Sequence, residues 1–437
     1  MKTIFVIGAG RSVGSLIEYL SREAKIHNWQ IYVGDQNLEL AEKRAALYDN
    51  VVATLFDVKD IQELVNRVSK SDLVISMLPA HMHHPVAQVC VEHKKPLLTA
   101  SYCSDDITSL NDLAVEKNTL ILMEMGLDPG IDHMSAMRDI DQIREKGGDI
   151  TLFKSFTGGL ISSESDTNPW HYKITWNPRN VVIAGQGGVK FKRNGRYKFI
   201  PYHNLFDRTE DVVFNENTIF EGYPNRDSLK YEDIYGLEGI PTILRGTLRK
   251  KPFSKAWNIL VKLGLTDDKI FVDDFSELTY RDFTNAFLPY DEVKKVEQKI
   301  RDIFNADDES LELLDWLGLF SNKVVGVKNW TAAQILQKLI EEKWKLEDDD
   351  KDMIVMQHQI QYKLNGKLHE HKSSLMLIGD DASNTSMAKT VGLPLGIAAK
   401  LILLEKISLQ GVKIPISKEI YEPVLKELKE LGVFFTY

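Results

Sequence analysis

The chain has 437 residues, of which 43% are hydrophobic and 27% are charged, and its formal net charge is -9. A chain of this length is too long to fold around one ordinary hydrophobic core, so two or three domains are expected. The negative charge argues against a nucleic-acid partner, because phosphate binding needs a basic face. The two cysteines have no zinc-type spacing and are too few for a disulfide framework.

The first residues lead directly into an apolar run, residues 4–7, without a signal-peptide pattern. No apolar run is long and continuous enough to span a membrane. We therefore expect a cytoplasmic protein without a membrane partner.

A glycine-rich loop follows this first predicted strand, with the spacing G-x-G-x-x-x-G at Gly8, Gly10 and Gly14. In such a loop the first glycine makes a tight turn and the second lets the backbone approach a pyrophosphate. The third, Gly14, would allow close packing of a helix on a strand. Helical spacing begins at once after the loop, so the helix N-terminus would face the phosphates. The strand–loop–helix context predicts a dinucleotide site.

Asp35 ends the second predicted strand and lies 21 residues after Gly14 (35 minus 14). This is near the offset of an acid that binds the ribose of a dinucleotide, and the alternative is a turn residue after a strand. Further apolar runs, separated by helical or polar segments, lie at residues 51–56, 73–78, 97–100 and 120–123. The alternation predicts an α/β fold with a Rossmann-type, doubly wound parallel sheet.

Ligands of open α/β sheets bind outside the carboxyl ends of the strands. Three polar residues at these ends, Ser101, Tyr102 and Asp128, should therefore converge on one crevice. Asp128 stands in a Gly-Leu-Asp-Pro-Gly run before a predicted helix at residues 131–143. It could also serve only as the cap of that helix.

Three histidines, His81, His83 and His84, follow the fourth predicted strand and resemble a metal cluster. No carboxylate or cysteine partner lies at ligand spacing from them. We interpret them as loop histidines and predict no metal site.

Strand-like patterns resume at residue 150 and continue to about 220, including an alternation at 172–176. Helical spacing then covers residues 256–263, 293–304, 311–320 and 332–344. Two alternating runs, 353–364 and 367–378, flank Asn365-Gly366, which is a strong hairpin signal. Helices are expected at residues 385–404 and 419–431.

These patterns predict three regions. Residues 1–128 would form the Rossmann domain. Residues 129–251 and 352–437 would form a mixed-sheet α+β domain for substrate binding and dimerisation, with C-terminal helices that can pack back on the first domain. Residues 252–351 would form a helical insertion.

Two arginines stand out in the second domain. Arg226 lies in a predicted turn at residues 221–228, and Arg245 begins an Arg-Gly-Thr-Leu-Arg run. Arginine forks bind carboxylates in bidentate fashion, so this domain could hold an acidic substrate. The alternative for each arginine is a surface ion pair.

Several motifs together resemble saccharopine dehydrogenase of the L-glutamate-forming type, also called saccharopine reductase. The segments that carry the resemblance are residues 126–133, 168–169, 172–173, 223–228, 245–249, 316–320 and 386–392. The family implies a dinucleotide domain, a mixed-sheet substrate domain, a helical insertion and a homodimer. It also implies an oxidoreductase that interconverts saccharopine and water with L-glutamate and 2-aminoadipate semialdehyde, using NAD or NADP.

The resemblance assigns roles to individual positions. Substrate contacts are expected at Ser101, Tyr102, Asp128, Arg226, Arg245 and Thr247. Cofactor contacts are expected at Gly8, Gly10, Arg11, Ser12, Val13, Asp35, Asp57, Val58 and Leu78. Asp128 and Tyr102 are the candidates for proton transfer.

The chain departs from its fungal relatives at three places, one of which is the loop at residues 161–167, where the relatives' prolines are missing. Asp35-Gln36 replaces a Cys-Arg pair suited to a 2′-phosphate, so we expect a preference for NAD, with NADP allowed. Lys43 and Arg44 lie in the helix that follows, and one of these long side chains could reach back to a 2′-phosphate. Thr157 replaces a cysteine, so no catalytic role is assigned there. Two alternatives are a related imine-reducing enzyme, such as carboxynorspermidine dehydrogenase, and a catalytically silent dinucleotide-binding sensor.

Overall fold

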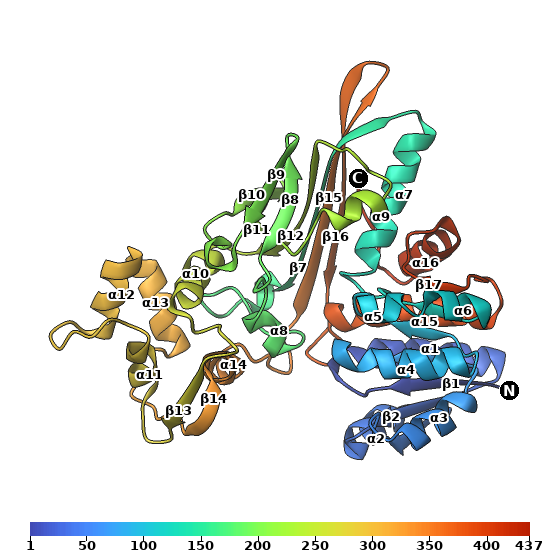
Figure 1. Cartoon of the computed structure of the whole chain (residues 1–437), viewed down its shortest axis with the longest axis horizontal. Coiled ribbons are helices and arrows are strands. Elements are labelled where there is room, and N and C mark those ends of the chain that lie inside the picture. Colours follow the sequence, from blue (N-terminus) through green and yellow to red (C-terminus); the bar gives the residue numbers. More distant parts are fainter. The chain divides into compact units, whose positions relative to one another are not determined.

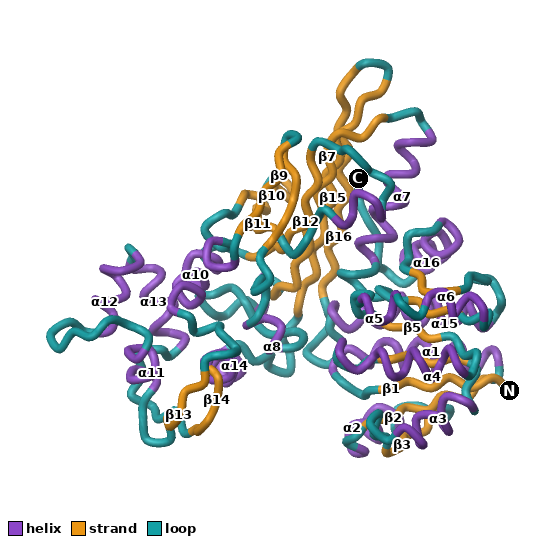
Figure 2. The backbone as a smooth tube through the Cα atoms, in the orientation of Figure 1, coloured by secondary structure: helices purple, strands orange, loops and turns teal.

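The computed structural model describes the backbone of all 437 residues and every side chain except that of Asp273. The chain divides into two compact units, one of residues 1–149 and 379–436 and the other of residues 150–378 with Tyr437. Figure 1 labels many of the elements of both units, and Figure 2 shows the same backbone coloured by secondary structure.

The first unit is built on a seven-stranded parallel sheet with the strand order β17-β6-β5-β4-β1-β2-β3. The strands are β1 Lys2–Ile7, β2 Trp29–Asp35, β3 Val51–Leu55, β4 Leu73–Ser76, β5 Leu97–Thr99, β6 Leu120–Leu122 and β17 Gly411–Lys413. Strand β4 is buried along its whole length, which explains its continuous apolar sequence. The order of the first six strands is that of a Rossmann fold, so this prediction is confirmed.

The first unit contains helices as well as strands. The helices are α1 Gly14–His27, α2 Leu38–Ala45, α3 Ile61–Ser69, α4 His83–Glu92, α5 Asp105–Thr108, α6 Asn111–Glu116, α7 Ile131–Glu145, α15 Ser386–Leu403 and α16 Lys418–Glu430. Side-chain caps fix where several of them begin. Asn37 accepts from two backbone N–H groups at the start of α2, and Asp60 does the same for α3.

The C-terminal segment belongs to the first unit, which corrects the predicted boundary of the second domain. Strand β17 pairs with β6, and α15 packs against α1 at very short range. A Cβ at Gly392 would lie 2.8 Å from the Leu16 nitrogen, and one at Gly396 would lie 2.6 Å from the Tyr19 ring. Glycine permits this close approach. Residues 129–149, including α7, also belong to the first unit, because α7 packs against α16.

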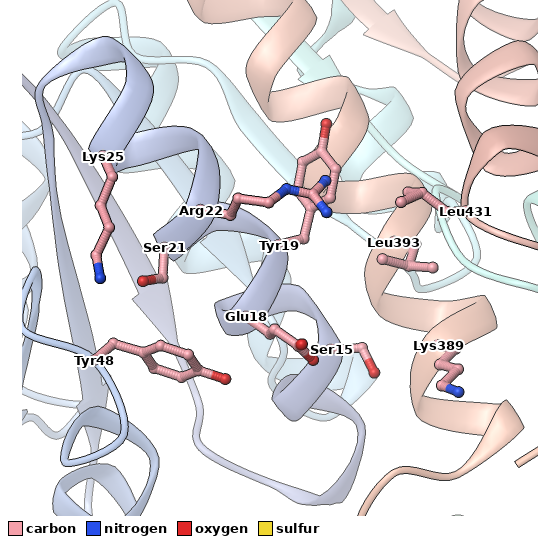
Figure 3. Close-up of a pocket in the computed structure, with 10 residues that line it drawn as sticks. All are labelled: Ser15, Glu18, Tyr19, Ser21, Arg22, Lys25, Tyr48, Lys389, Leu393 and Leu431. Carbon is pink, nitrogen blue, oxygen red and sulfur yellow. The ribbon is translucent and has the colours of Figure 1, made fainter. Parts of the chain in front are cut away.

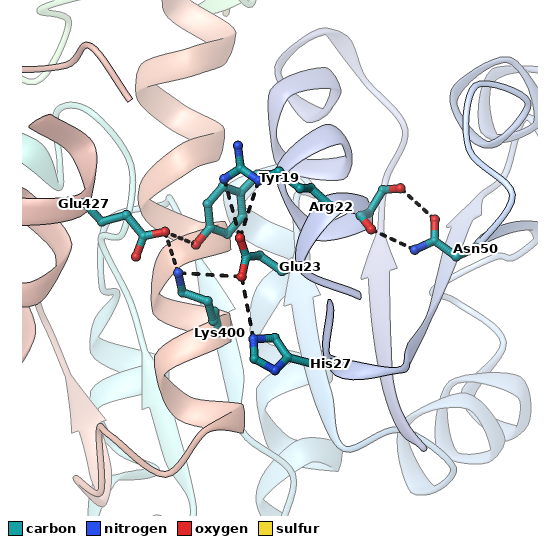
Figure 4. Close-up of polar contacts among 8 residues, drawn as sticks. Tyr19, Arg22, Glu23, His27, Asn50, Lys400 and Glu427 are labelled. Carbon is teal, nitrogen blue, oxygen red and sulfur yellow. Dashed lines mark hydrogen bonds and ion pairs between the residues drawn. The ribbon is translucent and has the colours of Figure 1, made fainter. Parts of the chain in front are cut away.

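A polar network joins α15 and α16 to α1 (Figure 4). Lys400 Nζ lies 2.5 Å from Glu427 Oε1 and 3.7 Å from Glu23 Oε2, so it bridges two carboxylates. The Tyr19 hydroxyl donates to the same Glu427 oxygen at 2.5 Å. Burial, and then this carboxylate, raise the pKa of the Tyr19 phenol, so it stays protonated. The network ties the end of the chain to the glycine-loop helix.

Helix α15 also corrects the expectation that no segment is long and apolar enough for a membrane. By length and composition it could cross one, but 72% of its 18-residue window is buried inside the structure. Its apolar sequence is explained by burial against α1.

The second unit is built on an eight-stranded mixed sheet with the path β10-β11-β12-β7-β15-β16, and β8 pairs with β12 and with β9. The strands are β7 Asp149–Ile161, β8 Val189–Arg193, β9 Arg196–Ile200, β10 Glu210–Asn215, β11 Thr218–Pro224, β12 Thr242–Arg249, β15 Asp352–Leu364 and β16 Lys367–Ile378. Asn365 and Gly366 both have positive φ between β15 and β16, so the hairpin prediction is confirmed. The mixed-sheet prediction is confirmed as well.

The predicted helical insertion contains α10 Phe253–Leu263, α11 Tyr280–Ala286, α12 Val296–Phe304, α13 Asp308–Leu317 and α14 Ala332–Lys343. It also contains an antiparallel pair that the sequence analysis missed, β13 Phe271–Phe275 and β14 Val327–Thr331. Its core is continuous with that of the sheet. Trp170, Trp257 and Trp344 are all fully buried together, and the Trp170 indole donates to the Leu313 carbonyl at 2.9 Å.

The predicted strand at residues 172–176 is wrong. Tyr172 and Ile174 are buried in this shared core, and the segment has no regular structure. The Ile174 N–H donates instead to the Trp344 carbonyl at 2.8 Å, so the insertion satisfies the backbone that a sheet would otherwise pair. Two short helices complete this unit, α8 Pro178–Val182 and α9 Lys230–Ile234.

Candidate active site

The glycine loop connects β1 to α1 in the first unit. Gly8 has a φ of 103°, and a Cβ there would lie 3.1 Å from the Met77 carbonyl oxygen, so glycine is required. The extra residue of the motif is taken up by a short 3₁₀ turn, Arg11–Val13, before α1 begins. A Cβ at Gly10 would meet no atom within 4 Å. The space above Gly10 is therefore open to a phosphate group, as a dinucleotide requires.

Asp35 lies at the end of β2, where the ribose-binding acid was expected. Its Oδ2 accepts from the Ala9 N–H of the glycine loop at 2.8 Å, and its Oδ1 accepts from the Asn37 N–H at 2.8 Å. These bonds fix the carboxylate beside the loop. They leave further lone pairs on each oxygen for a ligand hydroxyl.

Arg44 of α2 reaches back to the same loop. Its Nη2 donates to the Gly10 carbonyl at 3.2 Å, and burial lowers the pKa of the guanidinium. A Cβ at Gly14 would lie 3.3 Å from Arg44 Nη1. Gly14 therefore makes room for this side chain, which corrects the prediction that it serves helix–strand packing.

The other residues expected to contact the cofactor follow strands of the first sheet at its carboxyl edge. Arg11 and Asp57 are exposed, Ser12 is half-buried and Val13 is buried. Val58 and Leu78 are half-buried and pack on the hydrophobic core of the first unit.

Tyr102 and Asp128 come together within the first unit, although 26 positions separate them. The Tyr102 hydroxyl donates to Asp128 Oδ1 at 2.9 Å. Asp128 is not the cap of α7, because that helix begins at Ile131 with Gly130 in the capping position. Asp132 instead accepts from the Gly130 N–H at 2.6 Å. The alternative hypothesis that Asp128 serves only as a helix cap is therefore wrong.

The turn that carries Asp128 is held by glycines. Gly130 has a φ of 145°, and a Cβ there would lie 2.1 Å from the Gly126 carbonyl oxygen. A Cβ at Gly126 would lie 2.9 Å from that of Ala100, the residue before Ser101. This close approach brings the end of β5 beside the turn.

His83 corrects the interpretation of the three histidines as loop residues. It begins α4, is only 1% exposed, and contacts side chains at the ends of β4 and β5, among them Ser101. A signal was present in the sequence, because His83 shares helical spacing with the buried Val86, Ala87 and Cys90. Among the described residues, no group of His, Cys, Asp or Glu is arranged to hold a metal.

A second buried histidine, His133, was also not predicted from the sequence as a site residue. Through Glu124 it holds the loop that contains Cys103. His133 Nε2 lies 2.7 Å from Glu124 Oε2, and Glu124 Oε1 accepts from the Cys103 N–H at 2.9 Å. Glu124 has a φ of 61°, which is unusual for a residue with a side chain. Such strain is retained where the surroundings require the conformation.

In the second unit, Arg245 and Thr247 lie within β12, and Arg226 lies in the turn that follows β11. Arg245 and Thr247 are two residues apart, so their side chains share a face of the sheet. Arg245 is 6% exposed, and its guanidinium lies 4.1 Å from the centre of the Tyr231 ring. The Asn225 N–H donates to the Arg245 carbonyl at 2.8 Å, which places the exposed Arg226 beside this strand. Arg226 has a φ of 52°, again outside the usual region.

A cavity of about 400 Å³ lies elsewhere in the first unit, along α1 (Figure 3). Its lining residues are Ser15, Glu18, Tyr19, Ser21, Arg22, Lys25, Tyr48, Lys389, Leu393 and Leu431. None of them is a predicted site residue, so this cavity is distinct from the strand-end site.

Two family models cover nearly the whole chain. The saccharopine dehydrogenase NADP binding domain matches residues 4–122, and the saccharopine dehydrogenase C-terminal domain matches residues 126–433. The chain belongs to the saccharopine dehydrogenase family. The match confirms the resemblance inferred from the motifs, and it extends to both units.

Individual members of the saccharopine dehydrogenase family agree. Saccharopine dehydrogenase [NADP(+), L-glutamate-forming] of Schizosaccharomyces pombe is 31% identical over 99% of this chain and 98% of its own length. Mitochondrial alpha-aminoadipic semialdehyde synthase of Bos taurus is 33% identical over 100% of this chain, which spans only 47% of that longer protein. The solved structure of apo histidine-tagged saccharopine dehydrogenase (L-Glu forming) from Saccharomyces cerevisiae matches with a TM-score of 0.89 and 29% identity, covering 100% of this chain and 99% of the other.

Proposed function

We propose that this protein is an oxidoreductase of lysine metabolism that converts saccharopine, oxidised nicotinamide dinucleotide and water into L-glutamate, 2-aminoadipate 6-semialdehyde, reduced cofactor and a proton. The observation that carries this proposal is the Tyr102–Asp128 hydrogen bond of 2.9 Å at the carboxyl edge of the sheet that bears the glycine loop. The near full-length relatives named saccharopine dehydrogenase support it.

The residues around the glycine loop fit a dinucleotide. Gly10 leaves open space for a pyrophosphate, and Asp35 is fixed beside the loop with acceptor capacity for ribose hydroxyls. The cofactor, when bound, would accept the hydride from the lysine-derived carbon next to the secondary nitrogen. All other steps need binding and proton transfer from the chain itself.

Tyr102 and Asp128 are the groups proposed for proton transfer. Loss of a hydride leaves an imine in the substrate, which water must attack before the C–N bond can break. Asp128 would take a proton from that water, and the Tyr102 hydroxyl would hold the carboxylate in place or pass a proton to the departing nitrogen. A carboxylate and a phenol in direct contact suit these two roles.

Saccharopine carries three carboxylates, and the arginines of the second unit are proposed to bind them. Arg245 is held against Tyr231, so its guanidinium is oriented before any ligand arrives. Arg226 is exposed on the adjoining turn. Oriented guanidinium groups favour planar, bidentate recognition of carboxylates.

Two residues favour opposite cofactors. The Asp35 carboxylate would accept from the ribose hydroxyls of NAD, and it would repel a 2′-phosphate by on the order of a kcal/mol or more. Arg44, bonded to the Gly10 carbonyl, is a cation beside the same loop and would attract that phosphate. We propose that Asp35 dominates and NAD is preferred, while Arg44 allows NADP, the cofactor in the names of the fungal relatives.

Kinetics with both cofactors test this choice. We expect kcat/KM to favour NAD by at least about tenfold, or roughly 1.4 kcal/mol. Replacing Asp35-Gln36 by Ser-Arg should move the preference towards NADP, and Arg44→Ala should weaken NADP more than NAD. A wild-type preference for NADP would mean that Asp35 does not meet the ribose.

The central experiment follows the absorbance of the reduced cofactor with saccharopine as substrate. Saccharopine-dependent reduction, with glutamate as a product, is the expected result. Cofactor binding without turnover would favour the silent sensor, and turnover of carboxynorspermidine alone would favour that related enzyme. We also propose a homodimer, which light scattering of the purified protein would test.

A further inference from the structure

His83 is buried among three hydroxyl groups at the ends of β4 and β5. Its Nδ1 lies 2.9 Å from Ser76 Oγ. Its Nε2 lies 2.7 Å from Ser101 Oγ and 3.3 Å from Thr99 Oγ1. Ser76 and Thr99 are also buried, whereas Ser101 is half-buried and can meet a ligand.

The imidazole is neutral at ordinary pH. Burial, and then the charge of His81, lower its pKa to about 4. A neutral imidazole has one N–H and one acceptor nitrogen, so a hydroxyl at one nitrogen must donate to the ring and a hydroxyl at the other must accept from it.

The buried hydroxyls of Ser76 and Thr99 favour opposite forms, and the shorter contact decides: Ser76 Oγ lies 2.9 Å from Nδ1, whereas Thr99 Oγ1 lies 3.3 Å from Nε2 and already accepts from the Ser101 N–H. Within the described part of the chain, His83 Nδ1 is the one side-chain or backbone partner of the Ser76 hydroxyl. A buried hydroxyl proton without an acceptor destabilises the fold, because its lost hydrogen bond to water is not replaced. Ser76 must therefore donate to Nδ1, which leaves the imidazole proton on Nε2, facing Ser101.

We propose that His83 is a positioning residue: its Nε2–H donates to Ser101 Oγ and so turns the Ser101 hydroxyl proton away from His83, as a donor for a substrate carboxylate. The relay runs from Ser76 through His83 to Ser101. With the other tautomer, Ser101 would donate to His83 and could offer a ligand only an acceptor. A carboxylate is itself an acceptor, so it would then gain nothing from Ser101.

The backbone around Ser101 is fixed independently, so the hydroxyl is the part left for His83 to orient. The Glu124 N–H donates to the Ser101 carbonyl at 3.1 Å. The Cys103 N–H donates to Glu124 Oε1 at 2.9 Å, and Glu124 is held by His133. Substitution of His83 should therefore change the orientation of the Ser101 hydroxyl more than the backbone conformation of its loop.

The tautomer can be read without any substrate. In the full chain labelled with ¹⁵N-histidine, His83→Gln identifies the His83 signals among the 11 histidines. At pH 7 we expect Nδ1 to be of the unprotonated, pyridine-like type and Nε2 of the protonated, pyrrole-like type. In the Ser76→Ala variant, His83 should no longer be held in this one tautomer. The reverse assignment in the wild type would overturn the proposal.

A double-mutant cycle tests the effect on binding, and this arm rests on the proposed function. His83→Phe and Ser101→Ala should each raise the KM for saccharopine about tenfold, with the cofactor KM unchanged. In the double variant the KM for saccharopine should also rise about tenfold rather than hundredfold, because both substitutions remove the same hydrogen-bond donor, the Ser101 hydroxyl. His83→Gln should stay within about threefold of wild type, since its amide N–H can replace Nε2–H.

Independent, multiplying effects in the cycle would show that His83 acts only through packing and would overturn the proposal. If His83→Phe does not fold, Ser76→Ala takes its place in the cycle, with a smaller expected rise in KM. If the wild type does not turn over saccharopine at all, the proposed function fails, and the tautomer measurement still decides the state of His83.

Discussion

Protonation of His83 should lower the folding stability of this protein as the pH falls from about 7 to about 4.5. The pKa of its imidazole drops from 6.5 in the unfolded chain to about 4 in the folded one. Between these values the unfolded chain binds more protons at this position, so the free energy of unfolding rises with pH. At 1.36 kcal/mol per pKa unit, the loss from pH 7 to pH 4.5 is about 2.5 kcal/mol.

Urea unfolding of wild type and His83→Gln at both pH values measures this loss. Other groups titrate equally in the two proteins, so the difference between their acid-induced losses isolates His83. We expect the glutamine variant to lose about 2.5 kcal/mol less in the transition that the substitution affects. Equal losses would mean that the imidazole is not held neutral by burial, and the assignment of its proton would lose its basis.

Three further substitutions probe the site and the fold. Asp128→Asn should lower kcat by about 10²–10⁴-fold with saccharopine, while its thermal midpoint stays within a few degrees of wild type, because Asn still accepts from Tyr102. Near-normal turnover would remove Asp128 as the proton-transfer group. Arg226→Ala should raise the saccharopine KM by about 10- to 100-fold, from a charge-assisted pair of roughly 1.5–3 kcal/mol, and an unchanged KM would exclude it from the site. Lys400→Ala should destabilise the protein by about 3 kcal/mol in urea unfolding, because two carboxylates lose their bridging cation. The exposed Lys418→Ala should leave the midpoint nearly unchanged, and an equal effect of both would refute the buried-network argument.

The sequence determined features that depend on neighbouring residues. Hydrophobic periodicity predicted the strands of the parallel sheet and most helices, because burial on one face repeats at 2 or 3.6 residues. Asn365-Gly366 predicted the hairpin, since its turn requires positive φ at both positions. The strand-end argument selected Tyr102 and Asp128, because parallel strands deliver their carboxyl ends to one edge.

Only the tertiary structure decided features that depend on residues far apart in the chain. The place of residues 379–436 rests on glycines of α15 that fit against α1, and no local pattern records that fit. Arg44 meets the glycine loop only because α2 folds back towards it. His83 belongs with Ser76 and Ser101 because two strand ends enclose it, and its charge and proton position follow from that burial. Sequence spacing gives the direction of a side chain, whereas its partners and its protonation depend on what the whole fold packs around it.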